Sequence, residues 1–101
     1  MKYFAIGDED TILGFAIAGV GGRVVRNEEE AESAFREALS LSGIGVIIMT
    51  ERTADLIRRL VDEYVFSERF PLLVEIPDRR GRLPGRPGMK ELANAAIGVK
   101  I

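Results

Sequence analysis

The sequence has 101 residues, of which 47% are hydrophobic and 30% are charged, so we expect one domain over residues 1–101 with a core of modest size. The formal net charge of −2 comes from 16 acidic and 14 basic residues, and this near balance argues against a basic surface for nucleic acid. Cysteine and histidine are absent, which excludes disulfides, thiol nucleophiles and the commonest general base and metal ligand.

The hydropathy pattern predicts a soluble protein that does not insert into a membrane. The longest unbroken apolar run, residues 46–49, is far shorter than a membrane-spanning helix requires. Met1 leads directly into an apolar segment with no secretory signal pattern. We therefore expect a cytoplasmic location.

The chain opens with an apolar segment that predicts a strand over residues 3–6, followed by Gly7 and three carboxylates, Asp8, Glu9 and Asp10. A helix is predicted from Thr11 to Ala18, with Asp10 as its N-cap. Carboxyl ends of parallel strands face the crevice where ligands and partners usually bind, so the acidic turn lies where function is expected.

The first helix is predicted to cover the sheet with one apolar face, formed by Ile12, Leu13, Ala16 and Ile17. Phe15 lies about 130° from the centre of that face on a helical wheel. Its ring should therefore be at least partly uncovered, and an exposed aromatic side chain often marks a protein interface. Packing of Phe15 beneath a neighbouring loop is an equally good interpretation.

Further elements alternate along the chain. After a stop at Gly19 and a turn at Gly21 and Gly22, an edge strand is predicted over 23–26 and a helix from the N-cap Asn27 to Leu41. Residues 44–50 form a continuous apolar run that predicts a central strand covered on both faces. Thr50 or Thr53 is expected to cap a third helix, whose apolar stripe is Leu56, Ile57, Leu60, Val61 and Tyr64.

A fourth strand over 71–76 is predicted to end at Pro77, before a loop over 78–88 and a short helix over 89–96. Four alternations of strand and helix predict an α/β fold. We expect a small four-stranded parallel sheet with helices on both faces, in a Rossmann-like or receiver-like three-layer sandwich.

The acidic turn and the glycines suggest two kinds of catalytic or ligand site, and the sequence favours neither. A receiver-type phosphoacceptor needs an aspartate at the end of the third strand, where Met49 and Thr50 stand instead. Helix capping is thus the favoured role of the acidic turn over Mg²⁺ binding. The glycines of 19–22 follow a helix, whereas a phosphate-binding loop follows a strand. We expect no catalytic residues, cofactor or metal.

Two further segments could contact a partner. The loop over 78–88 carries Arg79, Arg80, Arg82 and Arg86, which could bind an acidic group, although a solvated state is favoured. Phe66 and Phe70 raise the same question as Phe15, and Phe70, beside Pro71, is expected to anchor in the core.

Several short motifs resemble the F-subunit of the V-type and A-type rotary ATPases and ATP synthases. They are Gly-Asp-Glu-Asp-Thr at 7–11 with Gly14-Phe15 and Ala18-Gly19 after it, Thr50-Glu51-Arg52 with Ala54, Glu75-Ile76-Pro77, and Ala96-Ile97-Gly98-Val99. They occur in the expected order over nearly the whole chain.

The resemblance implies a non-catalytic component of the central rotor stalk, without an active site or cofactor of its own, peripheral to the membrane on its cytoplasmic side. Its implied partners are the coiled-coil D-subunit, the membrane-side C-subunit of the stalk and, transiently, the catalytic A/B head, and its implied role is to regulate coupling of ATP turnover to ion transport. The residues expected to bind partners are Asp8, Glu9, Phe15, Glu51, Arg52 and Phe66. The alternative is a stand-alone receiver-like regulatory domain without a phosphoacceptor aspartate.

Overall fold

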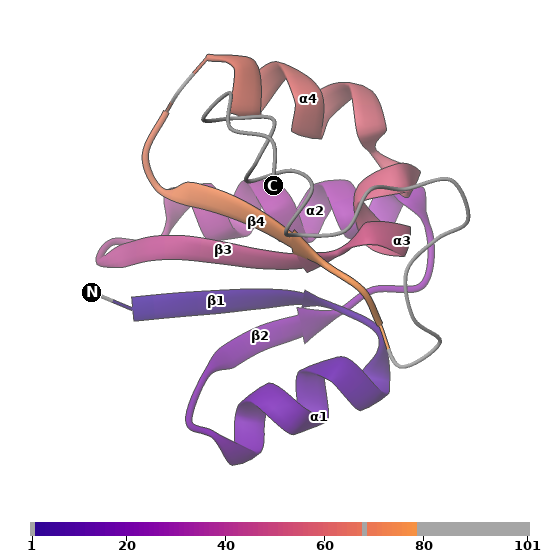
Figure 1. Cartoon of the computed structure of the whole chain (residues 1–101), viewed down its shortest axis with the longest axis vertical. Helices are drawn as coiled ribbons and strands as arrows, with labels where there is room; N and C mark the ends of the chain where they lie inside the picture. Colours follow the sequence, from indigo (N-terminus) through magenta and orange to yellow (C-terminus); the bar gives the residue numbers. More distant parts are fainter. Residues whose placement is uncertain (1, 68, 79–101) are drawn as a thin grey trace, which may run out of the picture.

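The structure, a computed structural model, describes residues 2–67 and 69–78 of the chain. Four parallel strands form one sheet in the order β2-β1-β3-β4 (Figure 1). The strands are β1 (Lys2–Gly7), β2 (Gly21–Val24), β3 (Ile44–Thr50) and β4 (Leu72–Ile76). The predicted four-stranded parallel sheet is confirmed, with β2 at one edge and β3 inside.

Helices cover both faces of this sheet, as predicted. They are α1 (Glu9–Ile17), α2 (Glu28–Ser40), α3 (Glu51–Leu56) and α4 (Arg58–Phe66). Figure 1 shows α1 alone against β1 and β2, and α2, α3 and α4 grouped on the opposite side. The helix predicted over 89–96 and the arginines of the preceding loop lie outside the described residues.

The hydrophobic core lies between the sheet and the group of α2, α3 and α4. Successive side chains of a strand point to opposite faces, and one face of β1 and β3 contributes buried residues to the core: Phe4, Ile6, Ile47 and Met49. The helices contribute Ala31, Ala34, Phe35, Ala38, Ala54, Val61 and Tyr64. The Phe35 ring meets the Tyr64 ring edge to face, with centroids 5.4 Å apart.

Helix α2 forms as its sequence predicts, because its cap and its apolar face agree. Asn27 Oδ1 accepts a hydrogen bond from Glu30 N at 2.8 Å, and Glu30 Oε1 accepts one from Arg26 N at 2.9 Å. The pairing resembles a capping box, except that Glu30 accepts from the N–H of Arg26, one residue before the N-cap, instead of from the N–H of Asn27 itself. The helix therefore begins at the predicted position.

The predicted third helix is two helices, which corrects the sequence-based expectation. Of the two candidate caps, Thr50 is the one used, since Thr50 Oγ1 accepts from Thr53 N at 3.2 Å. Helix α3 then ends at Leu56, and Ile57, with φ −131° and ψ 40°, separates it from α4. The break turns Ile57 into the core and leaves Leu56 exposed, so the continuous apolar stripe is wrong at its first residue.

The orientation and cap of the first helix also differ from the prediction. Its N-cap is Asp8, not Asp10, and the helix starts two residues earlier than expected. No residue of α1 is buried, and Leu13 and Ile17 are 62% and 81% exposed. The residues directed at the sheet are Ile12 and Phe15, both half-buried. The predicted face is right for Ile12 but wrong for Leu13, Ala16 and Ile17, because no charged residue beyond the first turn marks which side of α1 faces water.

The glycines after α1 form a strand rather than the predicted turn. Gly21 and Gly22 open β2, and a Cβ atom at Gly22 would lie 2.3 Å from the carbonyl oxygen of Ala5 on β1. Only glycine allows this close approach of the two backbones. The chain reverses direction two residues before β2, at Gly19, whose φ of +87° is in the left-handed region.

Candidate functional site

Charged and polar residues from all four strand ends meet at the carboxyl edge of the sheet. Asp8 follows β1, Arg26 follows β2, Thr50 ends β3 and Asp78 follows β4. They surround a hollow of about 310 Å³, whose lining residues are Asp8, Val25, Arg26, Thr50, Arg52, Thr53, Leu56 and Asp78. A second hollow of about 350 Å³ adjoins it beside Glu9 and Asp10. The order of elements predicted this polar, concave edge in part.

Asp8 is committed to capping α1. Thr11 Oγ1 donates to Asp8 Oδ1 at 2.6 Å, and Thr11 N donates to Asp8 Oδ2 at 3.2 Å. Partial burial raises the pKa of Asp8, but these hydrogen bonds to the carboxylate outweigh it, and the pKa is lowered below its usual value. The charged form of Asp8 is thus the form that this turn stabilises.

The other charges at this edge are paired across elements. Arg26, after β2, forms an ion pair with Glu9 in the first turn of α1. Arg52, in the first turn of α3, has its Nε 2.9 Å from Asp78 Oδ2, and the Asp78 side chain is almost fully buried. These pairs tie the helix starts to the strand ends. The edge is thus rich in charged side chains, and these two ion pairs join elements that are apart in the sequence.

Thr50 occupies the position where a receiver domain would carry its phosphoacceptor. Its hydroxyl donates to Thr53 Oγ1 at 2.8 Å and accepts from Thr53 N. The group is buried and used in the helix cap. Within residues 2–67 and 69–78, no three acidic side chains are placed to hold a metal ion together. The arrangement can cap helices and present charge to a partner.

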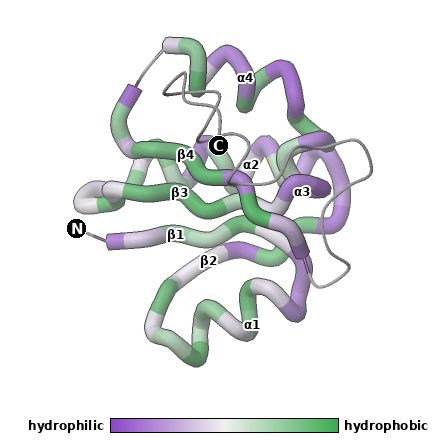
Figure 2. Tube along the Cα trace, viewed as in Figure 1, coloured by the Kyte–Doolittle hydropathy of each residue, from purple (hydrophilic) through white to green (hydrophobic). Residues whose placement is uncertain are grey.

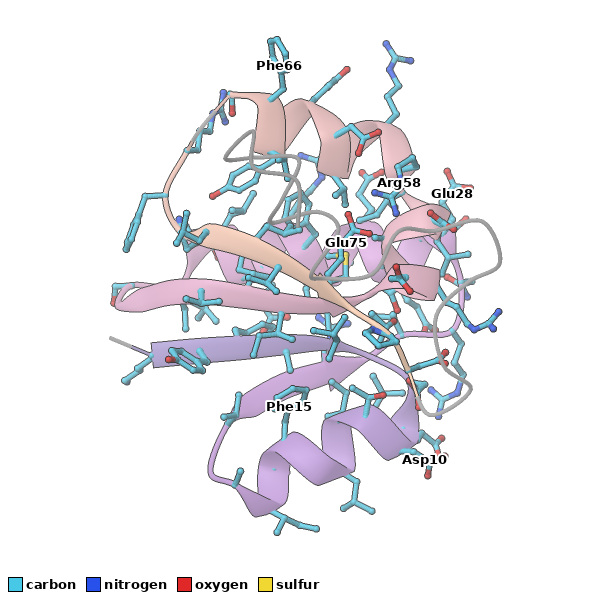
Figure 3. The ribbon with its side chains drawn as sticks, viewed as in Figure 1. Asp10, Phe15, Glu28, Arg58, Phe66 and Glu75 are labelled. Atoms are coloured by element: carbon cyan, nitrogen blue, oxygen red, sulfur yellow. The ribbon has the colours of Figure 1, made fainter. Side chains whose placement is uncertain are left out.

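The six residues expected to bind partners do not form one surface. Asp8, Glu9, Glu51 and Arg52 gather at the carboxyl edge, with Glu51 half-buried at the start of α3. Figure 3 shows Phe15 directed from α1 toward the sheet and Phe66 at the far end of α4, on the opposite side of the molecule. Phe66 is 90% exposed.

Large apolar side chains are exposed in several places, of which two lie at the end of α4 and on the outer side of α1. At the end of α4 and the start of β4 these are Val65, Phe66, Phe70 and Leu72. Phe70 is 69% exposed, so the expectation that it anchors in the core is wrong. The chain turns at this point into β4, and Pro71, not Phe70, enters the interior. The second place is the outer side of α1.

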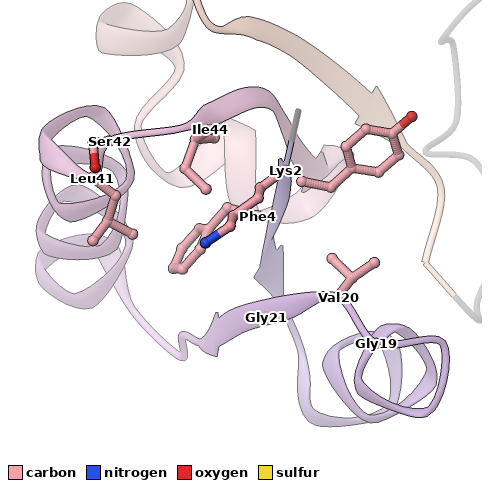
Figure 4. Close-up of a pocket in the computed structure, with 9 residues that line it drawn as sticks. Lys2, Phe4, Gly19, Val20, Gly21, Leu41, Ser42 and Ile44 are labelled. Carbon is pink, nitrogen blue, oxygen red and sulfur yellow. The ribbon is translucent and has the colours of Figure 1, made fainter.

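A larger hollow lies at the opposite, amino edge of the sheet, with a volume of about 640 Å³. Figure 4 shows Lys2 and Phe4 of β1 between Leu41 and Ser42 after α2 and Val20 after α1. Its walls are largely apolar. None of the residues expected to bind a partner lines it.

Sequence reasoning missed two members of the carboxyl edge and the exposed residues of α1. Arg26 and Asp78 each come two residues after the end of a strand, and the rule that places such residues at one edge could have found them. Leu13 and Ile17 were assigned to the wrong face. The uncharged run around them was the signal for a helix whose two sides are both apolar.

The geometry defines a small doubly wound α/β domain whose polar edge is made of helix caps and ion pairs. A family model described as "ATP synthase (F/14-kDa) subunit" matches residues 4–95. The chain therefore belongs to the ATP synthase F-subunit family.

Individual relatives agree along their whole length. The A-type ATP synthase F-subunit from Methanocaldococcus jannaschii is 38% identical, covering 100% of this chain and 99% of its own. The A-type ATP synthase F-subunit from Pyrococcus furiosus is 34% identical, covering 100% of this chain and 98% of its own. The crystal structure of the V-type ATP synthase F-subunit from Archaeoglobus fulgidus aligns with a TM-score of 0.58 at 29% identity, covering 74% of this chain and 95% of that one. The fold and the family thus agree.

Proposed function

We propose that the protein is a non-catalytic component of the central stalk of a V/A-type rotary ATPase. In that role it binds the coiled-coil D-subunit, contacts the membrane-side C-subunit and, transiently, the A/B head, and regulates the coupling of ATP turnover to ion transport. The observation that carries this proposal is the match to the F-subunit family over residues 4–95. The resemblance of the acidic turn and of Thr50-Glu51-Arg52 to that family's motifs supports it.

The proposed contact surface includes the carboxyl edge of the sheet and the end of α4. Asp8, Glu9, Glu51 and Arg52 would meet polar groups of a partner, and Phe66 would enter an apolar contact. Phe15 would contribute indirectly, because its ring lies between α1 and the sheet (Figure 3) and helps to position the start of α1 at this surface. Paired charges on a rigid edge favour correct orientation of a partner more than raw affinity.

The attachment to the membrane would be indirect. No helix among residues 2–67 and 69–78 is long and apolar enough to cross a bilayer. Contact through the D- and C-subunits would place the protein at the cytoplasmic side of the complex. The receiver-like alternative already lacks a phosphoacceptor aspartate, and it is disfavoured by the match to the F-subunit family over residues 4–95.

The proposal is tested by titrating the full chain with the D-subunit from the same organism in a calorimeter. We expect a stoichiometric complex, and no ATP hydrolysis by the full chain alone. Phe66→Ala should weaken the complex while the melting temperature stays unchanged, because the ring has few intramolecular contacts to lose. Leu41→Ala, at an exposed apolar residue of the opposite edge, is the control. Lack of any complex, or ATP turnover by the isolated protein, would refute the proposal.

A further inference from the structure

Helix α1 lies in a stretch of sequence without charge. Residues 11–22, from Thr11 to Gly22, contain no Asp, Glu, Lys or Arg, in a chain of which 30% is charged. The other long uncharged stretch, residues 38–50, contains β3, whose side chains are mostly buried. Figure 2 shows the same contrast, since α1 is white and green after its first turn, whereas α4 alternates between purple and green.

The structure buries only one side of this helix. Ile12 and Phe15 are directed at the sheet, and α1 contacts β1 and β2 on that side. On the outer side, Leu13 and Ile17 are one turn apart and largely exposed. Gly14 and Ala18 form an adjacent exposed row of small residues. The outer side thus combines a ridge of two large apolar side chains with a row of small residues beside it.

A helix that is apolar on all sides is normally buried on all sides. An apolar patch on a surface of otherwise charged residues is a marker of an interface. Helices α2 and α4 bury apolar residues on one side and carry charged residues such as Glu32, Arg36 and Arg59 on the other, although α4 also exposes Val65 and Phe66 at its end. Among the described helices, α1 is the one whose exposed side lacks charged residues beyond its first turn. A partner packed on that side would bury its apolar residues.

We infer that the outer face of α1, formed by Leu13, Gly14, Ile17 and Ala18, is the surface on which a helix of the coiled-coil stalk protein packs. This inference rests on the proposed function. Residues four apart on a helix form ridges, and a partner helix can lay a ridge of its own over the small residues Gly14 and Ala18. Small side chains there allow the two axes to approach to about 8–10 Å.

The size of the face favours this occupant over a second copy of the chain. A helix of nine residues is about 13 Å long and about 10 Å wide, so its outer face offers roughly 130 Å². A stable pair of proteins needs about 800 Å² on each partner. The face is therefore too small to hold a dimer by itself. It suits a long partner that also touches the protein elsewhere, as a coiled coil running past the domain does.

The acidic first turn of α1 indicates which residue types the partner helix should present. The first turn of α1 carries Glu9 and Asp10 after the capping Asp8, and the Glu9 side chain is largely exposed although paired with Arg26. The rest of the face is uncharged. The matching helix should thus present uncharged residues opposite Leu13 and Ile17 and Lys or Arg near the acidic turn.

The inference is tested by measuring the affinity of the full chain for the D-subunit with Leu13→Lys and Ile17→Lys. Each substitution places a charge on a side chain that is exposed in the free protein, so the melting temperature should not fall. Each should weaken the complex roughly tenfold or more, because the ammonium group would be buried without a partner in the complex. Leu41→Lys, at an exposed residue of similar type on the opposite edge of the sheet, should leave the affinity unchanged. Ile17→Ala provides a milder variant that keeps the helix intact.

The outcomes separate this inference from the proposed function. If the wild-type chain binds the D-subunit and the α1 variants bind equally well, the inference is wrong and the proposed function stands. If the wild-type chain does not bind the D-subunit, both fail. If sedimentation velocity shows a wild-type dimer that Ile17→Lys converts to a monomer while binding of the D-subunit is retained, the occupant is a second copy of the chain, and the inference is overturned.

Discussion

The two faces of the sheet are covered very differently. On one side, α2, α3 and α4 share a core in which Phe35, Ile47 and Val61 are almost completely buried. On the other side, α1 alone rests on β1 and β2, with no buried residue of its own. The first side has the features of a finished domain interior. On the second side, Leu13 and Ile17 of α1 stay largely exposed.

The stability of the protein therefore lies mainly on the α2 side, and its available apolar surface lies on the α1 side. Close packing makes the α2 side costly to alter, since a lost side chain leaves a cavity. The α1 side has little packing to lose. Substitutions should therefore separate into those that affect folding and those that affect binding, according to the face on which they lie.

The largest effect is expected from Phe35→Ala on the α2 side. The ring is 1% exposed and packs edge to face with Tyr64, so its removal should lower the free energy of unfolding by about 3–5 kcal/mol. Urea denaturation monitored by circular dichroism measures this. Phe66→Ala, at a ring that is exposed on α4, is the control and should change the value by less than about 0.5 kcal/mol. Equal losses for the two variants would contradict the comparison.

A smaller effect is expected from Phe15→Ala on the α1 side. This ring is half-buried between α1 and the sheet, and full burial of a phenylalanine contributes about 1.5–3 kcal/mol. Half of that burial suggests a loss of about 0.75–1.5 kcal/mol in the same urea experiment. A loss as large as that of Phe35→Ala would mean that the two faces are packed equally well.

Loss of the α1 cap should cost about 1 kcal/mol and depend on pH. Asp8→Ala removes the acceptor for Thr11 N, and a loss of about 1 kcal/mol is usual when an N-cap side chain is removed. The pKa of Asp8 is lower in the folded protein than in the unfolded chain. Its charge therefore contributes stability above the unfolded pKa of about 3.9, and this is lost as pH falls through the folded pKa.

Unfolding of the wild type and of Asp8→Asn should accordingly be compared at neutral pH and well below the unfolded pKa of about 3.9. Asparagine keeps the capping oxygen but not the charge. The advantage of the wild type over this variant should be present at neutral pH and disappear in acid. A difference that grows as the pH falls would contradict the assignment of a lowered pKa to Asp8.

The smallest effect is expected from Glu75→Gln, which weakens an ion pair that ties α4 to β4. Arg58 Nη1 and Nη2 lie 2.7 Å and 2.9 Å from the two carboxylate oxygens of Glu75, and the hydrogen bond to Glu75 is the main reason that the pKa of Arg58 is raised. Both side chains are partly exposed, so the loss should be at most about 1 kcal/mol and should shrink in about 1 M salt. Glu63→Gln, in the exposed pair with Arg59, is the matched control with almost no effect.

The strands β1, β3 and β4 and the helix α2 could be predicted because each local signal pointed the same way. The run 44–50 has the continuous apolar pattern of an inner strand, and Asn27, Ala31, Ala34 and Phe35 give α2 both a cap and a clear apolar side. Helices α1 and α3 could not be placed as well. In α1 the apolar residues surround the axis, and in α3 the break at Ile57 falls within an unbroken helical pattern of sequence.

The candidate site was predicted in part for a related reason. The residues of the acidic turn and of Thr50-Glu51-Arg52 stand next to strand ends in the sequence, so topology alone brings them to one edge. The pairing of Arg52 with Asp78 joins residues that are far apart in the chain. Only the order of strands β3 and β4 in the sheet brings these two side chains together.

Hydrophobic periodicity and short motifs are local properties, so they were enough to predict the alternation of strands and helices, the parallel sheet and the resemblance to the F-subunit family. The tertiary structure alone decided which side of α1 meets the sheet, that Gly22 must approach Ala5 without a Cβ, and that Phe70 lies outside the core. These features depend on contacts between residues that are distant in sequence. The type of an apolar residue does not indicate which other residues it packs against.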